Sequence, residues 1–79
     1  MDSNTAIKSL RCKKLKTQQE IADLLEISRQ TYNNYESNIL KVDLDTCLNI
    51  LKKLDATEIE IDEFFNAIKQ DYMSYKNEK

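Results

Sequence analysis

The chain has 79 residues with 12 basic and 14 acidic side chains, which predicts one small domain over residues 1–79 with a net charge of −2. It contains no glycine and no histidine, which excludes phosphate-binding glycine loops and removes the commonest general base and metal ligand. It has no proline and no long apolar run, so we expect a cytoplasmic domain of helices joined by short turns, with no membrane span, cofactor, metal or small-molecule substrate.

The first predicted helix begins at Asn4 or Thr5, either of which is a good N-cap, and runs to about Leu15. Its inner face carries apolar residues at helical spacing, Ala6, Ile7 and Leu10. Lys8, Lys13 and Lys16 remain for the outer side and the C-terminal end. They are either DNA phosphate contacts or part of an ordinary solvated helix surface.

Residues 17–36 contain two short helical patterns separated by a break at Glu26–Ile27. Thr17 is a good N-cap, and Glu20 three residues later completes a capping box. The first pattern continues with apolar residues at helical spacing, Ile21, Leu24 and Leu25, with Ala22 beside them. Ser28 is a second N-cap and opens the second pattern. Two short helices with a tight turn between them are typical of a helix-turn-helix.

The second helix of this pair divides into an aromatic face and a polar face. Stepping about 100° per residue places Tyr32 and Tyr35 together on the inner side. The outer side carries hydrogen-bonding side chains, Arg29, Gln30, Asn33 and Asn34. Arginine can bond guanine bidentately, and asparagine or glutamine can bond adenine in the same way. We therefore predict that these four side chains read base edges in the major groove of double-stranded DNA, with Arg29 and Gln30 best placed.

This stretch resembles the Cro and phage-repressor class of helix-turn-helix proteins, the XRE family, of prokaryotes and phages. The resemblance covers roughly residues 7–65 and is carried by Gln18, Ala22, the apolar positions Ile21, Leu25, Ile27 and Tyr32, and the closing pair Tyr35–Glu36. Two positions depart from the family pattern. Glu26 stands in the turn where the family usually has glycine, so it must take a positive φ or reshape the turn. Lys16 precedes the N-cap of the first helix of the pair, where an apolar residue is usual.

The resemblance implies an all-α, five-helix, lambda-repressor-like DNA-binding domain with the helix-turn-helix as helices two and three. It also implies an ion pair between Arg11 in the first helix and Glu36 at the end of the recognition helix. In the family the loop after the recognition helix contacts phosphates, and the corresponding residues here are Asn38 and Lys41.

Thr17 and Gln18 lie where the first helix of the pair begins, and we predict that they hold a further phosphate. Free backbone N–H groups and the helix dipole favour anions at such a position. Gln18 is also placed to brace Arg29 from the side. Phosphate contacts of this kind orient a domain on DNA and do not read its sequence.

A fourth helix is predicted over residues 43–54, capped by Asp43 or Asp45, with a core stripe of Leu44, Cys47, Leu48, Leu51 and Leu54. Residues 55–60 are predicted to be a linker, and a C-terminal helix follows over about residues 61–75. Part of its apolar face packs on its own domain, namely Ile61, Phe64 and Ile68. The remaining aromatics form a homodimer interface or a solvated edge, namely Phe65, Tyr72 and Tyr75.

The charged residues divide unevenly between the two halves of the chain. Residues 1–41 carry seven basic and five acidic side chains, whereas residues 42–79 carry five basic and nine acidic ones. The basic half can therefore face phosphates, with a modest dependence of binding on salt. The carboxylates near the start of the last helix, Glu58, Glu60, Asp62 and Glu63, are interpreted as solvated charges and not as a metal cluster. Cys12 and Cys47 are too far apart in sequence to predict a zinc site.

The expected function is sequence-specific binding of double-stranded DNA by a transcriptional regulator, a repressor or autoregulator that acts as a homodimer on an inverted-repeat operator. An alternative is an antitoxin-like module that binds a protein partner through its acidic C-terminal half. An enzyme is not expected, because the sequence shows no general base, nucleophile pair, metal ligand set or cofactor loop.

Overall fold

A computed structural model describes residues 2–77 of the chain, with side chains described up to residue 74. Within that range every regular element is helical, with five α-helices and one short 3₁₀ helix. In chain order they are α1 (Ser3–Lys13), α2 (Gln18–Leu25), α3 (Arg29–Ser37), η1 (Ile39–Lys41), α4 (Leu44–Lys53) and α5 (Glu58–Asn77). The all-α, five-helix prediction is confirmed.

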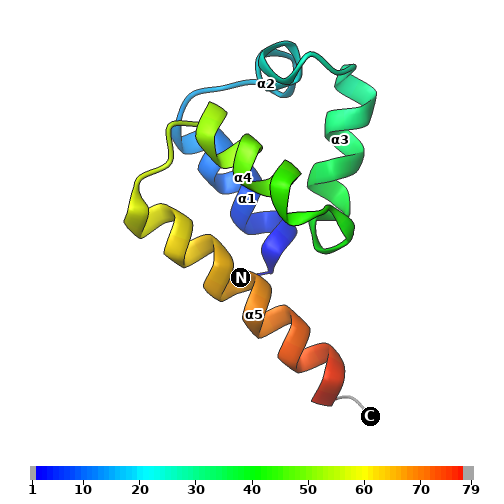
Figure 1. The fold of residues 1–79 in the computed structure, drawn as a ribbon, viewed down its shortest axis with the longest axis vertical. Coiled ribbons are helices and arrows are strands. Elements are labelled where there is room, and N and C mark those ends of the chain that lie inside the picture. Colours follow the sequence, from blue (N-terminus) through cyan, green and yellow to red (C-terminus); the bar gives the residue numbers. More distant parts are fainter. Residues whose placement is uncertain (1, 78–79) are drawn as a thin grey trace.

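The helices form two groups that share α1. On one side α2 packs on α3 and α4, and on the other side α1 packs on α5, while α1 also contacts α3 and η1. Figure 1 shows α5 crossing below the other helices, with its C-terminal half continuing past them. None of the helices within residues 2–77 is both long and apolar enough to cross a membrane.

The core lies between α1, α2, α3 and α4, with Phe64 of α5 closing one side. It contains eleven buried side chains, Ile7, Leu10, Ile21, Ala22, Tyr32, Ile39, Cys47, Ile50, Leu51, Leu54 and Phe64. The predicted stripe of α4 is wrong at two positions, because Leu44 and Leu48 are 60% and 42% exposed and Ile50 is buried instead. With about 100° per residue, Cys47, Ile50, Leu51 and Leu54 fall within one narrow arc, and Leu48 lies about 100° from its centre.

The ends of α1 and α5 also differ from the prediction. Asp2, and not Asn4 or Thr5, caps α1, because its carboxylate accepts the N–H of Thr5 at 2.7 Å. α5 begins at Glu58 and not near residue 61, because Thr57 caps it. The hydroxyl of Thr57 accepts the N–H of Glu60 at 3.2 Å, while the Glu60 carboxylate accepts the N–H of Thr57 at 2.9 Å. The linker before α5 is therefore shorter than predicted, because residues 58–60 form the first turn of the helix.

Three helices end in a left-handed residue that is not glycine. Leu15, Glu26 and Asp55 have φ values of 60°, 59° and 54°. In each case the next residue donates its N–H to the carbonyl five positions earlier, at 3.0–3.1 Å. This is the Schellman helix end, which usually takes glycine at the left-handed position. Of the two alternatives left open for Glu26, the structure has the positive φ, and the turn is not reshaped.

Replacing Leu15 or Glu26 by glycine should therefore stabilise the domain. A left-handed conformation costs an L-residue about 1–2 kcal/mol, and glycine's extra freedom in the unfolded chain offsets about 0.4–1 kcal/mol of the gain. We expect a net increase of about 0.5–1 kcal/mol for each variant in urea unfolding. Lys52→Gly, at an exposed right-handed position in α4, is the control and should lower stability. If Leu15→Gly lost as much stability as this control, the left-handed conformation of Leu15 would not be strained.

Candidate nucleic-acid interface

The recognition helix α3 presents its polar side chains to solvent because its other face is held in the core. Ser28 caps the helix, with Oγ accepting the N–H of Thr31 at 3.1 Å. Tyr32 is completely buried, Glu36 is 5% exposed, and Tyr35 is partly buried against the core. The four predicted base-reading side chains all lie on the exposed side, Arg29, Gln30, Asn33 and Asn34. One face of α3 is thus an uninterrupted polar strip.

A buried ion pair fixes the end of α3 to α1. Nε of Arg11 donates to Oε2 of Glu36 at 2.5 Å, and Nη2 donates to Oε1 at 3.4 Å. The same guanidinium donates through Nη1 to the carbonyl of Lys16 at 2.8 Å. Because Arg11 also holds the turn that precedes α2, one side chain from α1 orients both helices of the helix-turn-helix.

Gln18 extends this network to the exposed strip of α3. Its Nε2 atom lies 3.1 Å from Oε1 of Glu36 and 3.1 Å from Oδ1 of Asn33. Gln18 therefore braces Asn33, and not Arg29 as the sequence suggested. The bond leaves the Asn33 amide group oriented by the protein before any ligand arrives, and such preorganisation favours specific contacts.

The charges of the network are mutually stabilised. Burial alone would raise the pKa of Glu36, but the interactions of its carboxylate with Arg11, Tyr32 and Gln18 outweigh it and hold this pKa below its ordinary value. The hydrogen bond to Glu36 raises the pKa of Arg11. Burial, followed by the interaction of its hydroxyl with the Glu36 carboxylate, raises the pKa of Tyr32. Both members of the ion pair stay charged at neutral pH.

Most of the predicted phosphate contacts near α2 gather in one shallow groove beside the recognition helix. Lys16, Thr17 and Gln18 line it, together with Arg29 and Asn33 of α3. Lys8 also lines this groove, on the same side of α1 as Arg11. The two residues share a helix face because they are three positions apart.

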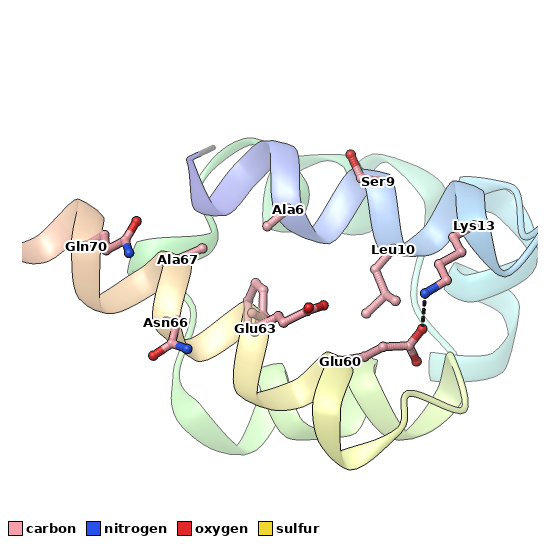
Figure 2. Close-up of a pocket in the computed structure, with 10 residues that line it drawn as sticks. Ala6, Ser9, Leu10, Lys13, Glu60, Glu63, Asn66, Ala67 and Gln70 are labelled. Carbon is pink, nitrogen blue, oxygen red and sulfur yellow. Dashed lines mark ion pairs between the residues drawn. The ribbon is translucent and has the colours of Figure 1, made fainter.

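Lys13 lies elsewhere, on the side of α1 that meets α5. Figure 2 shows its side chain reaching toward Glu60, and its Nζ atom lies 2.7 Å from Oε2 of that residue. Lys14 pairs with Oε1 of the same carboxylate at 2.9 Å. The hydrogen bond from Lys13, followed by those from Thr57 and Lys14, lowers the pKa of Glu60 to about 2. Glu60 is therefore a buried, paired group and not the solvated charge predicted, and Lys13 points away from the groove.

The loop after α3 forms a second hollow at the other end of the recognition helix. Asn38 and Lys41 line it, next to Asn34 and Tyr35 of α3. The side chain of Asn38 donates to the carbonyl of Asn34 at 3.3 Å. Lys41 is exposed at the end of η1. The polar strip of α3 thus has a candidate phosphate contact at each end.

The predicted dimer residues on α5 differ in their surroundings. Phe65 is partly buried against the core and meets Phe64 edge to face, with ring centroids 5.4 Å apart. Tyr72 is 56% exposed toward the C-terminal end of α5, and Met73 beside it is 49% exposed. The side chain of Tyr75 lies outside the described residues. Exposed apolar surface therefore remains at this end of α5.

Comparison with known protein families identifies the same part of the chain. A family model described as "Helix-turn-helix" matches residues 7–61, which include α2, α3 and most of the remaining core. No curated protein and no solved structure matches the chain significantly. The side chains described within residues 2–74 include no group of three or more residues that could hold a metal ion.

Proposed function

The chain belongs to the XRE family of helix-turn-helix DNA-binding regulators, and from this we propose that it is a repressor which binds an inverted-repeat operator as a homodimer. The fold of the family, a lambda-repressor-like bundle, agrees with the five helices found in residues 2–77. DNA is the ligand, and helix α3 is the element that we propose enters its major groove.

The observation that carries the proposal is the polar strip of α3. Arg29, Gln30, Asn33 and Asn34 are exposed together, while Tyr32 anchors the helix from the other side. Their donors and acceptors suit base edges. Lys8, Lys16, Gln18 and Lys41 are our candidates for phosphate contacts on either side of the strip. Lys13 is no longer a strong candidate, because a phosphate contact would require it to leave Glu60.

Homodimer formation is supported by the size of the domain and by the exposed end of α5. A single recognition helix of this length contacts few base pairs, so two copies on a two-fold site gain both affinity and specificity. Phe65, Tyr72 and Tyr75 remain our proposed contacts between the two α5 helices, and Met73 is added to them because of its exposure.

A protein partner is the second candidate function, favoured by three exposed leucines outside α5. Leu40 of η1 and Leu44 and Leu48 of α4 are 51%, 60% and 42% exposed. Large exposed apolar side chains close together in sequence are typical of interaction sites. In this hypothesis the chain is an antitoxin-like or other protein-binding module, and its acidic C-terminal half is the surface that binds the protein partner.

Selection from random duplex DNA with the purified chain separates the two candidates. At about 50 mM and about 200 mM salt, we expect enrichment of an inverted repeat whose half-sites lie about one helical turn apart. Its persistence at the higher salt would support a dimeric, sequence-reading regulator. Enrichment of a single half-site would remove the homodimer from the proposal. No enrichment, or binding that vanishes at the higher salt, would favour the protein-partner function.

A further inference from the structure

Asn4, in the first turn of α1, holds both sides of the turn that follows the recognition helix. Its Nδ2 atom donates to the carbonyl of Ser37 at 2.9 Å, and its Oδ1 atom accepts the N–H of Ile39 at 2.9 Å. Ser37 ends α3 and Ile39 begins η1. A carboxamide can donate and accept from one planar group, so this single side chain spans the junction from a distant part of the sequence.

The junction itself is irregular and has functional neighbours. Asn38, between the two bonded groups, leaves the helical region with φ −139° and ψ 46°. The next residue, Ile39, is buried in the core, which sets the depth of η1. Asn38 and Lys41, the proposed phosphate contacts of this loop, are therefore placed relative to α3 by the bonds that hold residues 37–39.

The first turn of α1 is a firm support for such a bond. Ser3, the preceding residue, is completely buried. Its N–H and its hydroxyl both donate to Oδ2 of Asp71 in α5, at 2.6 Å and 2.7 Å. Asp2 caps the same turn. Asn4 thus extends from a turn that is fixed to α5, and it lines a small hollow of about 210 Å³ next to Lys8, Gln18 and Asn33 of the proposed interface.

We propose that Asn4 is a positioning residue for operator binding, which orients the α3–η1 junction so that Lys41 reaches the DNA backbone. This inference rests on the proposed function. The protein backbone engages the amide oxygen and one N–H of Asn4, and in this inference Asn4 acts on DNA through Lys41. Because phosphate contacts by lysine release counterions, a lost contact leaves a signature in the dependence of binding on salt.

The test is a double-mutant cycle between Asn4→Ala and Lys41→Gln, measured on the selected operator over a range of salt concentrations. Each single variant should weaken binding roughly 10-fold, as expected for a lost hydrogen bond to a charged group. Each should also reduce the slope of log affinity against log salt by about 0.9, the value for one phosphate contact. The double variant should bind no more weakly than either single variant, because the two changes remove the same contact.

Ser9→Ala is the matched control, at an exposed position of α1 on the side of α5, and should leave affinity and slope unchanged. Losses that multiply in the double variant, or weaker binding by Asn4→Ala with an unchanged slope, would overturn the inference. If Asn4→Ala melts below the assay temperature, Asn4→Asp replaces it, since it keeps the acceptor for Ile39 and loses the donor to Ser37. If the unmodified chain selects no operator, the proposed function fails, whereas normal binding by both Asn4 variants defeats this inference alone.

Discussion

Replacing Gln30 and Asn33 together by alanine should abolish sequence-specific DNA binding while leaving the domain folded. Both side chains are exposed on α3, so their removal exposes no core and breaks no ion pair. A bidentate contact between a side chain and a base contributes about 1–3 kcal/mol of discrimination. Two such contacts together give about 2–6 kcal/mol, a loss of roughly 30-fold to more than 10⁴-fold in specific affinity. Titration of the selected operator and of a scrambled duplex measures the loss.

The matched control removes two asparagine amides from other exposed surfaces, Asn49→Ala in α4 with Asn66→Ala in α5. This variant should bind the operator as the unmodified chain does. Thermal melting of both double variants checks that the fold persists. Undiminished preference for the operator over the scrambled duplex in Gln30→Ala with Asn33→Ala would show that α3 is not the reading element.

Breaking the ion pair between Arg11 and Glu36 should lower the stability of the domain by more than the loss of an exposed carboxylate does. Glu36→Ala leaves the guanidinium of Arg11, which is 8% exposed, without its carboxylate partner. Removing one partner of a buried pair typically costs about 3–5 kcal/mol. A domain of this length is expected to have only about 4–12 kcal/mol in total. Urea unfolding of Glu36→Ala should therefore show about 3–5 kcal/mol of stability lost, against a change within about 0.5 kcal/mol for the exposed control Glu63→Ala.

The combined variant Arg11→Met with Glu36→Met shows whether the loss comes from the unpaired charge. It removes both charges at once and should recover most of the stability lost in Glu36→Ala. A double variant as unstable as Glu36→Ala would mean that hydrogen bonds to Lys16 and Gln18, and not the charge, dominate the effect.

Lowering the pH should weaken the ion pair between Arg11 and Glu36 and reduce the free energy of unfolding. The pKa of Glu36 is lowered in the folded state, so its contribution is complete above the unfolded pKa of about 4.3 and is lost as pH falls through the folded value. Glu60 has the same sign, with a folded pKa of about 2. We expect the free energy of unfolding to decline below about pH 4.5. The decline should be weaker in Glu36→Gln, and an equal decline in that variant would exclude Glu36 as a source.

The sequence predicted the helix-turn-helix well because its signals are local. Thr17 with Glu20 and Ser28 with its following turn define two helix starts by hydrogen bonds within four residues. The spacing of Tyr32 then determines which side of α3 is buried, and the polar strip follows from it. The same local logic was available for α5, where Thr57 and Glu60 repeat the capping box, but the acidic composition of residues 55–60 suggested a linker.

Most of the errors concern contacts between distant parts of the chain. In α4 the helical spacing with Cys47, Leu51 and Leu54 already favours Ile50 on the inner face, which packs against α2 and leaves Leu48 outside. Lys13 and Lys16 differ by three positions, yet α1 ends between them, so one faces α5 and the other faces the groove. Asn4 was interpreted as a helix cap from its place near the start of α1. Its actual partners, the backbone groups of Ser37 and Ile39, are more than 30 positions away in the sequence. No local pattern encodes such partners.

The three left-handed helix ends also bear on how long the protein persists in a cell. At the net value of about 0.5–1 kcal/mol expected for each position, Leu15, Glu26 and Asp55 together raise the unfolded fraction roughly 10-fold to 100-fold over a chain with glycine at those positions. Proteases degrade the unfolded fraction, so a shift of even 1–2 kcal/mol changes protein abundance several-fold. We therefore expect proteases to degrade this chain faster than the same chain with glycine at the three positions. For a regulator controlled by its own concentration, rapid clearance shortens the time needed to release its target.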